Sequence, residues 1–232
     1  QSEGTAGVMY HDKDGKSSFR PSGEVHPVYK FPHRKGDRTE GAVVLYESPY
    51  KTKEGEVPHN LYLICHDPYA QSKSTSNESL GAAYVIKRPN NLSKPDDIIV
   101  ASYVGRPQTQ DEYNRNLFML AEYYNAKIGF ENDRGELIAY AKRYRKLHKL
   151  QEEFEMLDKR ELRSKNVKRQ YGMHMTEQRK RQGELYIRDW LITPRHTDEE
   201  GNVTLNLHKI YDPALLQELI KFNHKGNFDR VM

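Results

Sequence analysis

Two acidic residues follow segments that can place a carboxylate at the edge of a sheet, and a third follows a break between helical segments. Asp67 comes after the apolar run Leu61–Cys65, and Glu131 comes after the short run Lys127–Phe130. Asp229 follows a Gly-Asn pair that interrupts a helical pattern. An acid at the end of a strand projects toward the mouth of the sheet, so two such acids on neighbouring strands can converge on one divalent cation.

Carboxylates on separate elements are the ligands that two-metal hydrolysis of a phosphodiester requires. Mg²⁺ and Mn²⁺ prefer carboxylate oxygens, and two ions about 3.5–4 Å apart activate the attacking water and stabilise the leaving oxygen. The three acids therefore predict a site for two Mg²⁺ or Mn²⁺ ions. Each acid also has an ordinary structural interpretation. Asp67 suits a turn before Pro68, Glu131 suits the first turn of a helix, and Asp229 suits the surface.

Basic residues are concentrated in one part of the chain. The net charge is +4, but residues 141–182 hold 14 Lys and Arg against six Asp and Glu. Such a segment favours a polyanionic partner, and a solvated helical face is the alternative. The candidate nucleic-acid-binding residues are Arg106, in a Gly-Arg-Pro loop, and Lys142, Arg143, Arg145, Lys146, Arg179, Lys180 and Arg181.

The composition excludes several classes of protein. Cys65 is the one cysteine, so an internal disulfide is impossible, a reducing compartment is expected, and the thiol is interpreted as a core residue. The chain shows no signal-peptide pattern and no apolar run of the roughly 18–20 residues that a membrane span needs, which predicts a protein that is neither secreted nor membrane-bound. The phosphate-binding pattern GxxxxGK[ST] is absent, so no ATPase activity is expected.

The apolar and turn-forming segments predict a mixed sheet flanked by helices. Strands are expected at Ala42–Tyr46, Leu61–Cys65, Ala82–Ile86, Ile98–Val104 and Lys127–Phe130. Helices are expected after the capping residues Thr109, Asp133, Thr176 and Asp212, with a charged helical region continuing to about residue 170 and a hairpin turn at Asp198–Asn202.

This order of elements is that of the ribonuclease H-like fold, an α/β fold with a mixed sheet. Residues 1–40 are interpreted as an N-terminal arm or linker with at most short strands, and residues 41–232 as the domain, which ends in a hairpin and helix extension. Because the sequence starts at Gln1 and stops after Met232, it is expected to be a fragment of a longer protein.

Four ordered blocks resemble the nuclease domain of the large terminase subunit of tailed bacteriophages. The blocks are Ile64–Ala70 with Ser79–Val85, Ile99–Pro107, Tyr124–Asn132, and Leu215–Leu219 with Gly226–Asp229. The resemblance covers roughly residues 41–232. It implies a metal-dependent endonuclease that cuts concatemeric viral double-stranded DNA during genome packaging. Asp67, Glu131 and Asp229 would be its metal ligands, with Asp67 as the bridging carboxylate.

The resemblance also implies partners and a location. In the full-length protein an ATPase motor domain would precede this one, and the portal and the small terminase subunit would be partners in the cytoplasm of the host cell. The alternative is a non-catalytic module that binds DNA or the portal. A PD-(D/E)xK nuclease would need a Lys two residues after the second acid, where this chain has Asp133.

Overall fold

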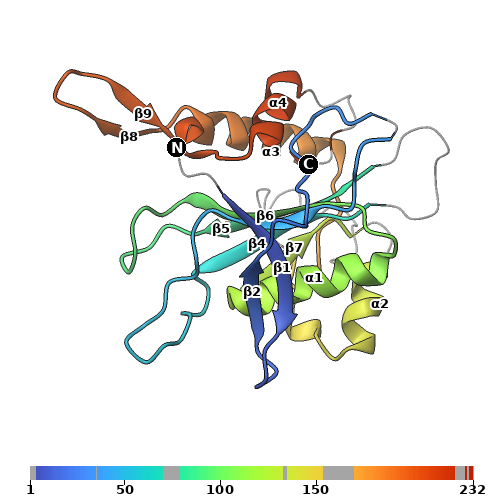
Figure 1. Ribbon diagram of the computed structural model, residues 1–232. Helices are drawn as coiled ribbons and strands as arrows, with labels where there is room; N and C mark the ends of the chain where they lie inside the picture. The colour runs from blue at the N-terminus through green and yellow to red at the C-terminus, as the bar shows by residue number, and fades with distance from the viewer. Residues whose placement is uncertain are drawn as a thin grey trace.

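The computed structural model describes residues 4–34, 36–69, 79–132, 135–153, 170–222, 228 and 230–231. Seven strands form one sheet in the order β2-β1-β3-β6-β5-β4-β7 (Figure 1). The strands are β1 (Thr5–His11), β2 (Ser17–Pro21), β3 (Ala42–Leu45), β4 (Tyr62–Asp67), β5 (Gly81–Lys87), β6 (Ile98–Gly105) and β7 (Lys127–Phe130). Among the described helices, none is long and apolar enough to span a bilayer.

The core of the sheet is an antiparallel trio followed by a parallel strand. Strand β4 pairs antiparallel with β5, β5 pairs antiparallel with β6, and the chain then forms helix α1 (Gln110–Tyr123) before β7. Strand β7 lies parallel to β4, on the side away from β5. Parallel neighbours need a long crossover connection, which α1 supplies. This topology is the ribonuclease H-like arrangement that the sequence predicts.

Two of the seven strands come from the segment interpreted as an N-terminal arm. Strand β1 pairs with β2 and with β3, so residues 5–21 extend the sheet beyond β3. Both strands also contact α1: the Ser17 hydroxyl donates to the Glu122 carboxylate at 2.6 Å. Residues 5–21 of this segment are therefore part of the same sheet as the strands of the predicted domain.

One face of the sheet is covered by α1 and by helix α2 (Glu136–Arg143) (Figure 1). Helix α1 begins where expected, because the Thr109 hydroxyl accepts the backbone N–H of Glu112 at 3.1 Å. The helix buries Leu117, Phe118 and Leu120 completely against the sheet. The core on this face is rich in tyrosine, and the ring of Tyr113 stacks on that of Tyr103 with centroids 4.6 Å apart.

The opposite face carries the C-terminal elements (Figure 1). They are helix α3 (Glu177–Leu191), the antiparallel hairpin β8 (Pro194–Thr197) and β9 (Val203–Leu205), and helix α4 (Pro213–Lys221). Thr176 caps α3 as predicted, and the hairpin turns at the expected acidic loop. A second core joins α4 to the sheet through Leu80, Ala82, Tyr84, Leu215 and Val231. The predicted C-terminal hairpin and helix extension is thus present.

The charged helical region predicted to reach about residue 170 is wrong over its described part. Helix α2 ends at Arg143, and Arg145 adopts a positive φ of 57°, a backbone conformation that cannot continue an α-helix. A short 3₁₀ turn at Leu147–Lys149 follows. The N-cap of α2 is Gly135, with φ of 70° and no side-chain cap, whereas the predicted cap Asp133 lies outside the described residues.

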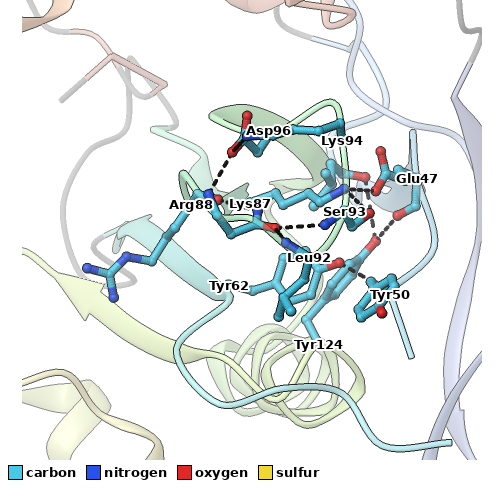
Figure 2. Close-up of polar contacts among 12 residues, drawn as sticks. Glu47, Tyr50, Tyr62, Lys87, Arg88, Leu92, Ser93, Lys94, Asp96 and Tyr124 are labelled. Carbon is cyan, nitrogen blue, oxygen red and sulfur yellow. Dashed lines mark hydrogen bonds and ion pairs between the residues drawn. The ribbon is translucent and has the colours of Figure 1, made fainter. Parts of the chain in front are cut away.

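A buried lysine fixes the end of the sheet that is remote from Asp67. Lys87 is completely buried, and its ammonium donates to the Glu47 carboxylate at 2.6 Å and to the Ser93 hydroxyl at 2.8 Å (Figure 2). Lys87 pairs with Tyr62 at the start of β4, five residues before Asp67. At about 3.3 Å per residue, this ion pair lies roughly 17 Å from Asp67 along the strand.

Acidic pH should destabilise the fold partly through Glu122. Burial alone would raise the pKa of Glu122, but hydrogen bonds from Lys146 and Ser17 and the nearby charges of Lys146 and His11 outweigh it, so the pKa is lowered from 4.5. A lowered pKa contributes stability that is present above the unfolded-state value and is lost as pH falls through the folded-state value. Glu122→Gln should cost about 1 kcal/mol at neutral pH and less in acid.

Urea unfolding of the parent and Glu122→Gln, from neutral pH down to about pH 3, measures this difference. The exposed Glu24→Gln is the control. Stability curves of the parent and Glu122→Gln that stay parallel over this range would contradict the assignment.

Candidate metal centre

Asp67 and Glu131 end two strands that are neighbours in the sheet. The parallel register of β4 and β7 runs from Leu63 opposite Lys127 to His66 opposite Phe130, so Asp67 and Glu131 form the next pair. The Glu131 N–H donates to the His66 carbonyl at 3.4 Å and continues the ladder to that position. In-register residues of parallel strands project from the same face, with strands about 4.8 Å apart. The structure therefore brings these two predicted acids together.

Both carboxylates belong to the face that also carries α3 and α4. Asp67 pairs with Ala82, which lies in the second core, whereas the preceding residue His66 stacks on Tyr113 of α1 on the opposite face. Two residues earlier on β4, Cys65 is exposed, so the expectation of a core thiol is wrong. The second core does not extend over β4 at this point. Asp67 and Glu131 are both half-buried.

Asp229, the third predicted ligand, lies outside the described residues, but residues on both sides of it are described. Phe228 is buried, and its ring lies 5.2 Å from that of Phe222 and 6.1 Å from that of Phe31. Val231 belongs to the second core, together with Ala82. Because Ala82 is the strand partner of Asp67, the described residues Phe228 and Val231 belong to a segment that packs on the face of the sheet carrying Asp67.

Two titratable side chains near Asp67, His66 and Tyr113, are uncharged at neutral pH. Burial lowers the pKa of His66 to about 4, although its hydrogen bond to the Ala82 carbonyl works in the opposite direction. His66 is therefore neutral at physiological pH. The pKa of Tyr113 is raised well above its usual value, first by burial, then by Tyr103 and by the negative charge of Asp67.

The donor chemistry at this edge fits a hard divalent cation. Two carboxylates from adjacent strands supply oxygen ligands, which Mg²⁺ and Mn²⁺ prefer. Within the described ranges, no group of three or more His, Cys, Asp or Glu residues is placed to hold a metal. Two acids do not complete the ligand set of a divalent cation, and the sequence analysis predicts Asp229 as the third ligand.

Arg106 is anchored beside the same strand end. Its guanidinium lies 5.0 Å from the centre of the Tyr69 ring and donates to the Ser79 carbonyl at 2.9 Å. Its backbone N–H donates to the carbonyl of Thr39 at 2.5 Å. Arg106 thus contacts the residues on either side of the stretch 70–78, which lies outside the described residues. The loop arginine expected from the sequence therefore contacts Tyr69, which lies two residues after Asp67.

The other predicted nucleic-acid-binding residues are divided between the two faces of the sheet. Lys142, Arg143, Arg145 and Lys146 lie in or after α2 on the α1 side, whereas Arg179, Lys180 and Arg181 lie in α3 on the face of the acids. Several are already paired: Arg143 with Asp111 at 3.0 Å, Lys146 with Glu122 at 2.6 Å, and Arg179 with Glu153 at 2.9 Å. These seven residues therefore do not form one continuous patch.

Asp212 has a structural role, as the sequence indicates. Its carboxylate accepts the N–H groups of Ala214 and Leu215 at 2.8 and 3.1 Å and so caps α4. It also accepts the Tyr84 hydroxyl at 2.8 Å. Sequence reasoning missed this tyrosine contact and the burial of Glu218 in the same helix. The helix's own sequence carries no signal for the burial of Glu218, because its partner Arg230 lies 12 residues later.

Comparison with solved structures finds a likeness to the crystal structure of the large terminase nuclease from thermophilic phage G20c. The TM-score is 0.36 and the sequence identity is 13%, over 77% of this chain and 89% of that chain. No protein-family model matches the sequence, and no curated protein matches it. A likeness at this level says nothing about chemistry, so any activity has to be inferred from the residues at the β4–β7 edge.

Replacing Asp212 should destabilise the domain through two losses. Asp212→Ala removes the cap of α4 and leaves the buried Tyr84 hydroxyl without its acceptor. Together these should lower the free energy of unfolding by about 2 kcal/mol. In an Asp212→Ala/Tyr84→Phe double variant the unpaired hydroxyl is gone, so part of the loss should be recovered. Chemical denaturation of the three proteins tests this, and a double variant no more stable than Asp212→Ala would contradict it.

Proposed function

We propose that this chain is a divalent-metal-dependent endonuclease acting on double-stranded DNA. The observation that supports the proposal most directly is the register of β4 and β7, which sets Asp67 beside Glu131 at the ends of two parallel strands. The basic residues of α3 lie on the same face of the sheet as these acids. An acidic metal site flanked by basic side chains suits a phosphodiester substrate, since the cations attract the phosphates and the carboxylates hold the ions.

In this proposal Asp67, Glu131 and Asp229 would hold two Mg²⁺ or Mn²⁺ ions. When bound, such ions activate water and offset the charge that develops on the phosphate. The protein's contribution would be to hold the carboxylates in a fixed geometry. The strand ladder holds the backbone of Asp67 and Glu131. The neutral ring of His66, next to Asp67, adds no positive charge that would compete with a cation.

The biological setting follows from the sequence resemblance and belongs to the same proposal. The nuclease would cut concatemeric viral DNA during genome packaging in the host cytoplasm. Its partners would be an ATPase motor domain of the same polypeptide, the portal and the small terminase subunit. The alternative, a module that binds DNA or the portal without cutting, makes no use of the paired acids and is the other outcome of the test below.

The purified chain should nick plasmid DNA with Mn²⁺ or Mg²⁺ and lose this activity in excess EDTA. Asp67→Asn and Glu131→Gln keep the side-chain shape but remove negative charge, so each should lower cleavage at least 100-fold and weaken Mn²⁺ binding. The exposed Glu24→Gln is the matched control and should cut like the parent. Binding of duplex DNA without any metal-dependent cleavage would favour the non-catalytic module.

DNA affinity should depend on salt through the basic residues of α3 rather than those of α2. Asp67, Glu131 and helix α3 share one face of the sheet. We therefore expect a duplex bound at the metal site to contact Lys180 and Arg181. Replacing both with Ala should flatten the log–log salt dependence by up to about 1.8, at about 0.9 per lost phosphate contact. The paired control, Lys142→Ala/Arg145→Ala on the opposite face, should leave the slope unchanged. A reversed result would place the DNA on the α2 side.

A further inference from the structure

Glu131 has hydrogen-bonded neighbours on both sides of the chain. On the side of β4, its N–H donates to the His66 carbonyl at 3.4 Å, which is longer than the roughly 2.7–3.2 Å of an ordinary N–H···O bond. On the other side Met173 forms a parallel bridge with Glu131. The Met173 N–H donates to the Phe130 carbonyl, and the Met173 carbonyl accepts the Asn132 N–H, both at 2.8 Å. The two peptide groups that flank Glu131 are therefore held more closely by Met173 than by β4.

The side chain of Asn132 binds the segment that supplies Met173. This segment, Tyr171–His174, is called the return segment below. The Asn132 amide donates to the Tyr171 carbonyl at 2.7 Å, and Asn132 is buried. Together with its backbone bond to Met173, this contact ties Asn132 to the return segment at two points. The residue next to Glu131 therefore fixes both the position and the direction of the return segment.

Gly172 lies between these two anchored residues, at a position that favours glycine. Its φ is 70°, in the left-handed region, and a Cβ there would lie 2.7 Å from the Asn132 Cβ and 2.8 Å from the Phe130 ring. Its N–H also donates to the Gln151 carbonyl at 3.0 Å. The return segment is thus packed directly against the end of β7, with no space for a side chain between them.

Arg179 of α3 closes the same edge. Its Nη1 donates to the His174 carbonyl at 2.8 Å and lies 2.9 Å from the Glu153 carboxylate, and both charged side chains are largely buried. Glu153 comes two residues after Gln151, whose N–H donates to the Ile128 carbonyl of β7 at 2.8 Å. Arg179 therefore joins the return segment to a second stretch of chain along the outer edge of β7.

We propose that Asn132 is a positioning residue, which together with the return segment holds the Glu131 carboxylate in place beside Asp67. This inference rests on the proposed nuclease function. The last bond of a strand ladder opens most readily, and here that bond is the long one from Glu131 to His66. Metal affinity depends on the groups that orient each ligand, so loosening the outer edge of β7 weakens the site even when Glu131 is present. Asn132 acts only through Glu131 and contacts neither metal nor DNA.

The test compares Asn132→Ala with the parent. Amide hydrogen exchange at Asn132 and Met173 should lose protection at least 10-fold, because the Tyr171 contact that fixes the return segment is gone. Calorimetric titration with Mn²⁺ should show at least 10-fold weaker binding. Cleavage should fall at low Mn²⁺ concentration and recover at saturating Mn²⁺, while the KM for DNA is unchanged. A role in stability alone would not produce this recovery at a temperature where both proteins are folded.

Three further variants complete the experiment. Asn116→Ala is the matched control, because it removes a side-chain amide that donates to the Tyr103 hydroxyl at 3.3 Å on the α1 side of the sheet. It should leave Mn²⁺ affinity unchanged. Gly172→Ala forces the return segment away from β7 and should weaken Mn²⁺ binding as Asn132→Ala does. Arg179→Gln should cause a smaller loss in the same direction, and it carries the test if the other two variants do not fold. The titration contains no DNA, so a lost phosphate contact cannot explain its result.

The outcomes distinguish the positioning role from the activity on which it rests. If the parent binds Mn²⁺ and cuts DNA while the folded variants of Asn132, Gly172 and Arg179 bind Mn²⁺ as tightly, the positioning role is overturned and the nuclease stands. The same holds if Asn116→Ala weakens Mn²⁺ binding as much as Asn132→Ala. If the parent neither binds Mn²⁺ nor cuts DNA, the nuclease proposal fails and the positioning role with it.

Discussion

The parallel pairing of β7 with β4 is the constraint on which the rest of the domain depends. A parallel neighbour cannot be reached by a tight turn, so the chain must cross the sheet in α1, and α1 must bury one side against the strands it crosses. The same pairing brings the carboxyl ends of β4 and β7 to one edge. Asp67 and Glu131 are neighbours for that reason alone, with no direct bond between them required. A shift of one residue in this register would turn Glu131 to the opposite face and separate the two acids.

The two faces of the sheet are packed differently where they meet β4. On the α1 side the tyrosine-rich core is continuous under β4, where Tyr62 and Ile64 are buried. On the other side α4 covers β5 and β6, but the cover ends before β4, and Cys65 is exposed. The filled face holds the strands in register, whereas the described part of the other face leaves Cys65 at the surface.

Features set by nearby residues could be predicted from the sequence. The five predicted strands and the caps at Thr109, Thr176 and Asp212 depend on alternation and on hydrogen bonds within four residues, and the structure has them. The prediction of a helix beyond Arg143 was wrong because the positive φ of Arg145 ends the helix, and charge and periodicity do not reveal that backbone conformation. For the site, strand ends at Asp67 and Glu131 were visible in the sequence. Their face and their shared register depend on pairing across 64 residues of chain.

The buried charge in α4 shows most clearly why local pattern is insufficient. The sequence pattern of α4 predicts that Leu215, Leu216, Leu219 and Ile220 are buried. In the structure Ile220 is 83% exposed and Glu218 is buried. Periodicity assigns a charged residue to solvent because an unpaired buried carboxylate is costly. The cost is offset here by Arg230, 12 residues later, and by two backbone N–H groups. A compensating partner at that distance leaves no trace in the helix's own sequence.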